Sequence, residues 1–201
     1  EHLSNKIVND QVFPKIESGF LDSEPLIREK TVIALIHLAP KLNYSNLDEI
    51  VVMKHFTRLA RDEQGGIRTN TTVCLGKIAR YLHPKTRQQC LFACFSRSLK
   101  DPFPPARNAA LLSLTATQQY HKALDVATKI LPHIAPIVLD AERDVRATFA
   151  SLGAALQSHG DMPGMPASSV GVGSSTTGCD GANHGAEHGA DHGADHGADH
   201  G

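Results

Sequence analysis

One short pattern recurs four times in this sequence at an almost constant interval. Each copy has an aspartate, five intervening residues and an arginine, and an apolar residue stands directly before the arginine. The four pairs are Asp22 and Arg28, Asp62 and Arg68, Asp101 and Arg107, and Asp140 and Arg146. Successive aspartates are 40, 39 and 39 residues apart. A period of about 40 residues is typical of HEAT and armadillo arrays, in which each repeat is a set of packed helices.

Apolar residues recur at fixed distances from these aspartates and predict the first helix of each repeat. The residues ten, nine and six positions before the aspartate are apolar in every copy. Offsets of three and four residues place them on one face of a helix. We expect a second helix to begin near each arginine. In the first three copies a small residue and a leucine follow that arginine by six and seven positions.

The sequence therefore predicts an all-α fold, a HEAT/armadillo-type α-solenoid of about four helical pairs. We place the array at residues 1–159, with repeats near 10–42, 46–82, 84–118 and 122–158. Residues 1–8 are interpreted as the end of a helix, and Asn9 or Asp10 as the N-cap of the next one. Because the chain begins at Glu1 without a methionine, we interpret it as a piece of a longer protein.

The composition changes abruptly near Gly160. Residues 160–201 hold eleven of the sixteen glycines and no Lys or Arg, and they end in His-Gly-Ala-Asp repeats. Such a segment cannot offset its ordering entropy by burying apolar surface, so we predict a disordered tail. Its histidines recur every four residues and raise a metal-binding hypothesis. The alternative is a tetrapeptide expansion without a role.

The formal net charge of −1 hides an uneven distribution. The first 160 residues carry 20 basic and 15 acidic side chains, a formal +5. That balance falls short of the clustered Lys and Arg that nucleic-acid-binding domains show, so no nucleic acid is expected. The apolar runs are too short for a transmembrane segment. The four cysteines form no disulfide-scaffold pattern, which favours a reduced, cytoplasmic compartment.

Catalytic signatures are missing from the sequence. It contains no GxGxxG, no GxxxxGK[ST], no HExxH, no GxSxG and no kinase HRD or DFG motif. Cys90 and Cys94 are four residues apart, but two thiolates are only half of a structural zinc site. We therefore predict that the chain is not an enzyme and has no cofactor and no metal site in the array.

The repeated aspartates and arginines are predicted to be structural. We expect the aspartates to cap the second helices and to contact arginines of the same or the adjacent repeat. Regular recurrence favours this interpretation over ligand binding, because repeat arrays reuse their interfaces. Second helices usually line the concave face of a solenoid, so we select exposed positions there as a candidate interaction surface. These residues are Lys30, His37, Lys77 and Arg80.

Several short runs, taken in order, resemble one known family. They are Phe20-Leu21-Asp22, Leu38-Ala39-Pro40-Lys41-Leu42-Asn43, Met53-Lys54-His55-Phe56, Asp62-Glu63-Gln64-Gly65, Asn70-Thr71-Thr72-Val73-Cys74-Leu75-Gly76-Lys77-Ile78 and Asp101-Pro102-Phe103. Together they closely resemble the HEAT-repeat region of the SCY-like, or N-terminal kinase-like, pseudokinases. The resemblance covers roughly residues 1–158 and is densest from 12 to 107.

In that family an inactive kinase-like domain precedes the HEAT array, and a basic carboxy-terminal tail engages coat components. Neither is present in this sequence. The resemblance implies a non-catalytic protein–protein interaction scaffold in COPI-linked Golgi-to-ER vesicle traffic. It would be cytosolic and peripheral to Golgi and ER–Golgi intermediate membranes, with coatomer or Golgi trafficking factors as partners; a homo-oligomer is also open. The alternatives are a generic HEAT-repeat adaptor of another pathway and a nucleic-acid-binding solenoid.

Overall fold

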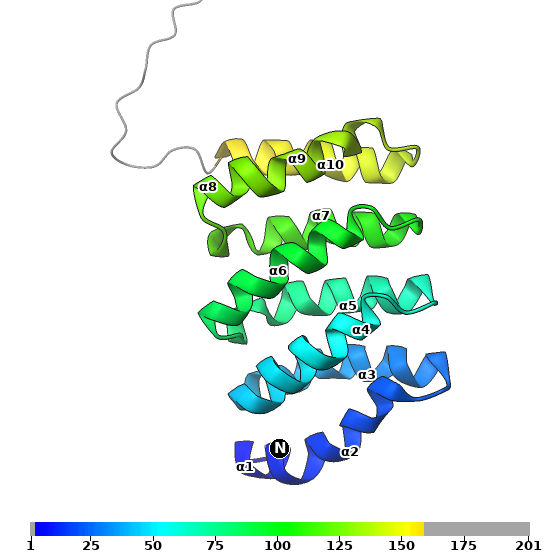
Figure 1. Cartoon of the computed structure of the whole chain (residues 1–201), viewed down its shortest axis with the longest axis vertical. Helices are drawn as coiled ribbons and strands as arrows, with labels where there is room; N and C mark the ends of the chain where they lie inside the picture. Colours follow the sequence, from blue (N-terminus) through cyan, green and yellow to red (C-terminus); the bar gives the residue numbers. More distant parts are fainter. Residues whose placement is uncertain (1–2, 159–201) are drawn as a thin grey trace, which may run out of the picture. The chain divides into compact units, whose positions relative to one another are not determined.

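The computed structural model describes residues 3–158 of the chain. Within this range the residues form helices joined by short turns, and no strand occurs among them (Figure 1). The predicted all-α class is therefore confirmed. The glycine-rich segment of residues 160–201, with its predicted disorder and its histidines, lies outside the described residues. The proposed limits of the array and of each repeat stay predictions.

The helices come in pairs, and each pair has a first and a second helix. The first helix of pair one is a bent series of short segments: α1 (Asn5–Ile7), η1 (Val8–Val12), α2 (Phe13–Glu17) and η2 (Ser18–Leu21). Its second helix comprises α3 (Pro25–Leu38) and η3 (Ala39–Lys41). In pair two, η4 (Ser45–Phe56) and α4 (Thr57–Leu59) precede α5 (Gly65–Ile78) and η5 (Ala79–Tyr81).

The remaining helices complete pairs three and four. In pair three, α6 (Pro84–Ser98) precedes α7 (Pro104–Ala116) and η6 (Gln118–Tyr120). The first helix of pair four consists of α8 (Ala123–Asp125), η7 (Val126–Ile130), α9 (Leu131–Ile134) and η8 (Ala135–Leu139). Its second helix is α10 (Arg143–Ser158).

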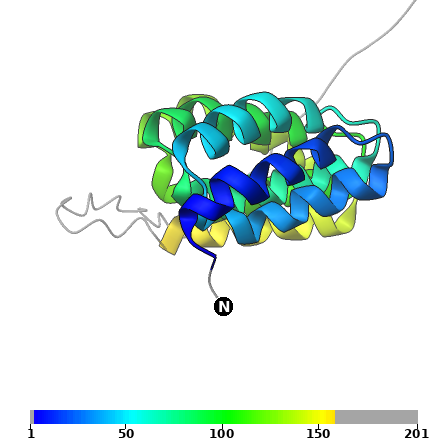
Figure 2. The same cartoon turned by 90° about the horizontal axis from the view of Figure 1, so that it is seen from below.

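The pairs stack so that α3, α5, α7 and α10 lie side by side in chain order (Figure 1). Seen from below, first and second helices form two layers (Figure 2). Leu35, Leu75 and Leu114 are buried in the core between the layers. At Gly76, an added Cβ would lie 2.8 Å from Ser113 Oγ. The α5 backbone therefore approaches α7 closely, as small residues allow.

The predicted N-cap of the first helix was wrong. Ser4 is the N-cap, and its Oγ accepts a hydrogen bond from the Ile7 amide at 3.3 Å. The side chain of Asn9 instead contacts the end of η3 and the connection that follows it. Its Nδ2 donates to the Lys41 carbonyl at 2.8 Å, and its Oδ1 accepts from the Asn43 amide at 2.8 Å. The Asn9 side chain thus makes a tertiary contact instead of capping a helix.

The helices of residues 3–158 differ from membrane-spanning helices. None of them combines the length and the apolar character needed to cross a bilayer.

Candidate functional site

The turn arginines join each repeat to the next through bidentate ion pairs. Nε and Nη2 of Arg28 donate to the two carboxylate oxygens of Asp62, at 2.8 and 3.0 Å. Arg68 holds Asp101 in the same way at 2.7 and 2.7 Å. The third pair joins Arg107 to Asp140 at 2.6 and 2.7 Å. Two parallel charge-assisted bonds fix orientation as well as distance.

The same arginines also close the turns that precede them. The Nη1 atom of Arg28 donates to the backbone carbonyls of Asp22 and Ser23, at 2.8 and 3.1 Å. Arg68 repeats this on the carbonyls of Asp62 and Glu63. Each turn arginine therefore donates to the backbone carbonyl of the aspartate in its own repeat. The carboxylate of that aspartate binds the arginine of the preceding repeat.

The aspartates brace their own turns rather than the first helical residues. Oδ1 of Asp62 accepts a hydrogen bond from the Gln64 amide at 3.0 Å, and Oδ1 of Asp101 accepts from the Phe103 amide at 2.9 Å. Gln64 and Phe103 are themselves the N-cap residues of α5 and α7. Each aspartate thus lies two residues before the cap and orients the chain that enters the helix.

The ion pairs change the acidity of these carboxyl groups. Burial is the largest single influence on Asp62 and Asp101, and it disfavours their charged forms. The arginine hydrogen bonds, the backbone amide hydrogen bonds and the nearby positive charges together outweigh burial and lower both pKa values. For Asp140, the hydrogen bond from Arg107 is the largest influence, and it lowers the pKa. All three aspartates are therefore ionised at neutral pH, and each charge is matched.

The two outermost members of the series have no counterpart in the described array. The Asp22 carboxylate accepts from the Glu24 amide at 2.8 Å, and no arginine in residues 3–158 contacts it. Arg146 donates to the carbonyls of Asp140 and Ala141. The eight turn residues thus provide three ion pairs between repeats and four turn closures within them.

The four residues of the candidate interaction surface are all exposed. Lys30 and His37 lie on α3, Lys77 on α5, and Arg80 on η5. His37 and Lys77 occupy the same repeat position, nine residues after the turn arginine. The Arg80 guanidinium lies 4.6 Å from the centre of the Tyr81 ring. The same guanidinium donates a hydrogen bond to the Tyr81 hydroxyl. Among the described residues none of the four forms an ion pair.

The first helices pack differently from one pair to the next. At the first interface, between pairs one and two, the rings of Phe20 and His55 stack with centroids 5.0 Å apart. His55 is buried, and its Nε2 lies 2.9 Å from Glu17 Oε1. The hydrogen bond with His55 is the largest influence on Glu17 and lowers its pKa. We define Phe20, Glu17 and His55 as the filled interface.

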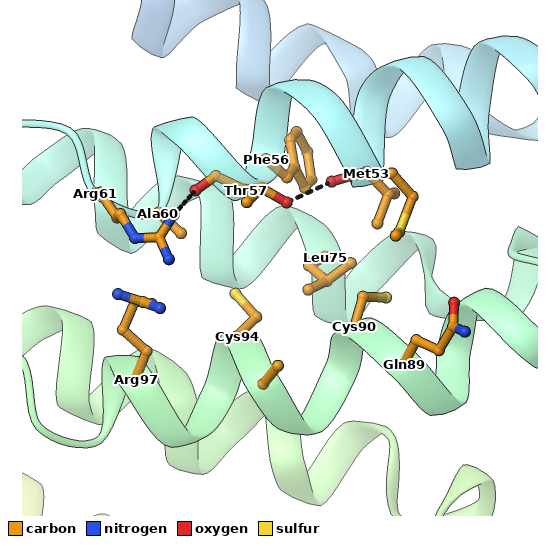
Figure 3. Close-up of a pocket in the computed structure, with 12 residues that line it drawn as sticks. Met53, Phe56, Thr57, Ala60, Arg61, Leu75, Gln89, Cys90, Cys94 and Arg97 are labelled. Carbon is orange, nitrogen blue, oxygen red and sulfur yellow. Dashed lines mark hydrogen bonds between the residues drawn. The ribbon is translucent and has the colours of Figure 1, made fainter.

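At the second interface, between pairs two and three, the corresponding space is open. Ala60, Thr57 and Cys94 line a cavity of about 210 Å³ there (Figure 3). Burial raises the pKa of Cys94 to about 11 and that of the neighbouring Cys90 to about 12. Both thiols are thus protonated at neutral pH and act as weakly polar wall groups. In residues 3–158 no three His, Cys, Asp or Glu side chains come together as metal ligands.

Sequence reasoning named Phe20 and His55 only within the family-like runs, and Cys90 and Cys94 only as half of a zinc site. It did not connect these residues, or Glu17, Thr57 and Ala60, with packing between the first helices. The available signal is a comparison of the repeats at positions two, five and seven before the turn aspartate. Those positions change from Phe, Glu and His at the filled interface to Ala, Thr and Cys at the open one.

Two curated relatives match most of the chain. "Probable inactive serine/threonine-protein kinase scy1" of Dictyostelium discoideum is 35% identical over 158 residues, which are 78% of this chain and 19% of that protein. "Protein kinase domain-containing protein ppk3" of Schizosaccharomyces pombe is 36% identical over 146 residues, 73% of this chain and 23% of that protein. The chain belongs to the SCY1-like family.

This SCY1-like chain spans about a fifth of the length of the curated relatives that it matches. Among solved structures it is similar to the crystal structure of Cex1p, with a TM-score of 0.69 and 28% identity over 77% of this chain and 30% of that one. No family model matches the sequence. One SCY1-like relative is named as a probable inactive kinase and the other by its kinase domain, so the comparisons bear on descent and fold.

Proposed function

We propose that the chain is a non-catalytic scaffold that binds proteins of COPI-linked Golgi-to-ER vesicle traffic through its second helices. Coatomer subunits and Golgi trafficking factors are the expected partners. The site of action would be cytoplasmic, on the surface of Golgi and ER–Golgi intermediate membranes. The support for this pathway is membership of the SCY1-like family and the ordered runs that resemble its HEAT-repeat region.

One observation carries the scaffold proposal: exposed side chains stand on a frame whose repeats are fixed to one another. The pairs Arg28–Asp62, Arg68–Asp101 and Arg107–Asp140 hold successive second helices in register. On that frame His37 and Lys77 recur at the same repeat position, with solvent around both. Stacked repeats of this kind present extended surfaces to protein partners.

The charge of these side chains indicates the kind of partner surface. Lys30, Lys77 and Arg80 are exposed cations without a described acidic neighbour in ion-pair range. Complementary charge accelerates encounter and favours one orientation. We therefore expect an acidic patch on the partner, and an association rate that falls as salt is added.

The test is binding of the purified full chain to immobilised coatomer at low salt, with two double variants. Lys77→Glu/Arg80→Glu changes the charge of the second-helix surface. Lys15→Glu/Lys85→Glu makes the same change in net charge at exposed positions of the first helices.

We expect the first variant to weaken binding by about tenfold or more and the second to leave it within about twofold. Equal binding by both variants would contradict the assigned surface, and no binding by the wild-type chain would contradict the coatomer proposal. Circular dichroism spectra that match wild type establish that both variants are folded.

A further inference from the structure

The open second interface contains a cavity that the proposed function does not use. It lies between the first helices of pairs two and three, and its volume is about 210 Å³ (Figure 3). Leu75 reaches it from α5, while Met53 and Phe56 contribute from η4. The thiols of Cys90 and Cys94 project from α6 on the opposite side. The walls are thus mainly apolar and come from three helices.

The cavity exists because small side chains replace the ones that fill the first interface. The replacements, at two, five and seven positions before the turn aspartate, are Ala60 for Phe20, Thr57 for Glu17 and Cys94 for His55. All three small residues line the cavity. Meanwhile α5 and α7 stay in close contact at Gly76 and Ser113, so the layer of second helices does not open.

The size of the cavity limits what it can hold. Pockets for drug-sized ligands have volumes of about 300–1,000 Å³. A dry cavity of about 150 Å³ lined by aliphatic and aromatic groups holds a benzene ring. The space between Met53 and Cys94 therefore suits one large apolar side chain better than a whole small molecule.

Two arginines line one end of this cavity. Arg61 and Arg97 face each other at one end of it (Figure 3). Beyond them, a shallower groove of about 490 Å³ continues past Lys100 and His133. No carboxylate in residues 3–158 forms an ion pair with either arginine.

The groove does contain one acidic residue, Asp101. Its carboxylate is already held by both nitrogens of the Arg68 fork at 2.7 Å. That charge is therefore matched within the array, and the arginines at the mouth remain available for an incoming anion.

We propose that this groove binds an acidic peptide segment of a partner protein. One large apolar side chain of the segment enters the cavity between Met53 and Cys94, and neighbouring carboxylates contact Arg61 and Arg97. The proposal rests on the scaffold function and adds a second, chemically distinct contact on the first helices. A single-chain anion such as a fatty acid fits less well, because it brings one carboxylate to a groove that Lys100 and His133 extend.

The test begins with a phage library of random dodecapeptides selected on the full chain. The most enriched sequence is then synthesised with a fluorescent label and its affinity measured by anisotropy. We expect enriched sequences to share a large apolar residue next to Asp or Glu. Arg61→Glu/Arg97→Glu should weaken binding by about tenfold or more, whereas Lys15→Glu/Lys85→Glu, with the same charge change, should leave it within about twofold.

A second variant tests the cavity without touching the arginines. Ala60→Phe/Cys94→His introduces the side chains of the filled interface. We expect it to weaken peptide binding by about tenfold while the chain stays folded. The proposal is overturned if no peptide is enriched, if the enriched peptides lack the acidic–apolar pattern, or if this filled variant binds as tightly as wild type.

A calorimetric titration with laurate provides the other arm. Laurate binding that the same two variants abolish, together with no peptide enrichment, would assign the groove to a single-chain anion instead. The coatomer assay separates the two proposals, because it depends on Lys77 and Arg80. Coatomer binding that persists in the Arg61→Glu/Arg97→Glu chain leaves the scaffold function standing when the groove proposal fails.

Discussion

The filled and open interfaces join the same kinds of helices, yet only one of them is packed on the side of the first helices. Both have an arginine–aspartate pair with nearly equal bond lengths on the side of the second helices. At the filled interface Phe20 stacks on His55, whereas at the open one Ala60 and Cys94 leave about 210 Å³ vacant. The ion pairs and the second-helix packing are thus sufficient to hold the register of the repeats. Packing of the first helices is then free to vary.

The largest effect should follow from making the filled interface resemble the open one. Phe20 is fully buried, and Phe20→Ala removes its contacts with both His55 and Phe56. We expect a loss of about 4 kcal/mol in unfolding free energy, as for other buried Phe→Ala changes. Urea unfolding followed by circular dichroism measures it. A loss below about 1 kcal/mol would mean that the neighbouring repeat collapses around the space.

Arg68→Ala tests the arginine–aspartate ion pair, which both interfaces contain. It leaves the largely buried Asp101 carboxylate without its cation and removes two bonds to turn carbonyls. We expect about 3 kcal/mol of destabilisation, because the remaining charge is unpaired. Arg80→Ala, an exposed control on the same second helix, should stay within about 0.5 kcal/mol. Similar melting temperatures for the two variants would show that the ion pair adds little to the array.

The pH dependence of stability should differ between the two interfaces, because only the filled one contains Glu17. Its pKa, like those of Asp62 and Asp101, is lowered in the folded chain. The ionised carboxylates therefore stabilise the fold above their ordinary pKa of about 4, and this stabilisation is lost as the pH falls through the lowered values. Glu17→Gln should lower the melting temperature by a few degrees at pH 6 and by less as the pH falls through the lowered pKa of Glu17 towards pH 2. An equal difference at both pH values would exclude a carboxylate contribution.

The smallest effect should come from making the open interface resemble the filled one. Ala60→Phe/Cys94→His fills apolar space, and we expect a gain of about 1 kcal/mol, the usual range for cavity filling. The Thr57→Glu change, added to this pair, would supply the carboxylate that Glu17 offers to His55. A loss of stability in the double variant would show that the two helices cannot separate enough to accept the rings.

The regular features of the fold follow from the sequence, and the irregular ones do not. The spacing of aspartates and arginines predicted the helical pairs, because every repeat needs the same turn. The sequence did not decide whether each aspartate binds the arginine of its own repeat or of the adjacent one. Arg28 and Asp62 are 34 residues apart, and only the stacking of the repeats brings them together. The N-cap was missed at Ser4 because Asn9 is used by Lys41 and Asn43.

The open interface was missed for a different physical reason. Ala60, Thr57 and Cys94 are ordinary residues for a helix surface, and no single one marks a cavity. The cavity is indicated only by residues that differ between repeats at matched positions. A periodic pattern, by contrast, is recognised from the residues that stay the same. Arg61 and Arg97 lie 36 positions apart in the chain and face each other only across the stacked first helices (Figure 3).

The double use of each turn arginine has a consequence for chain length. One end of the guanidinium is tied to carbonyls five and six residues upstream, so the turn itself admits no insertion or deletion. The other end reaches an aspartate 34, 33 or 33 residues downstream, a distance that already differs by one. A change of length between an arginine and its aspartate can therefore lie in the rest of the second helix, in the connection or in the next first helix, while the clamps stay in place.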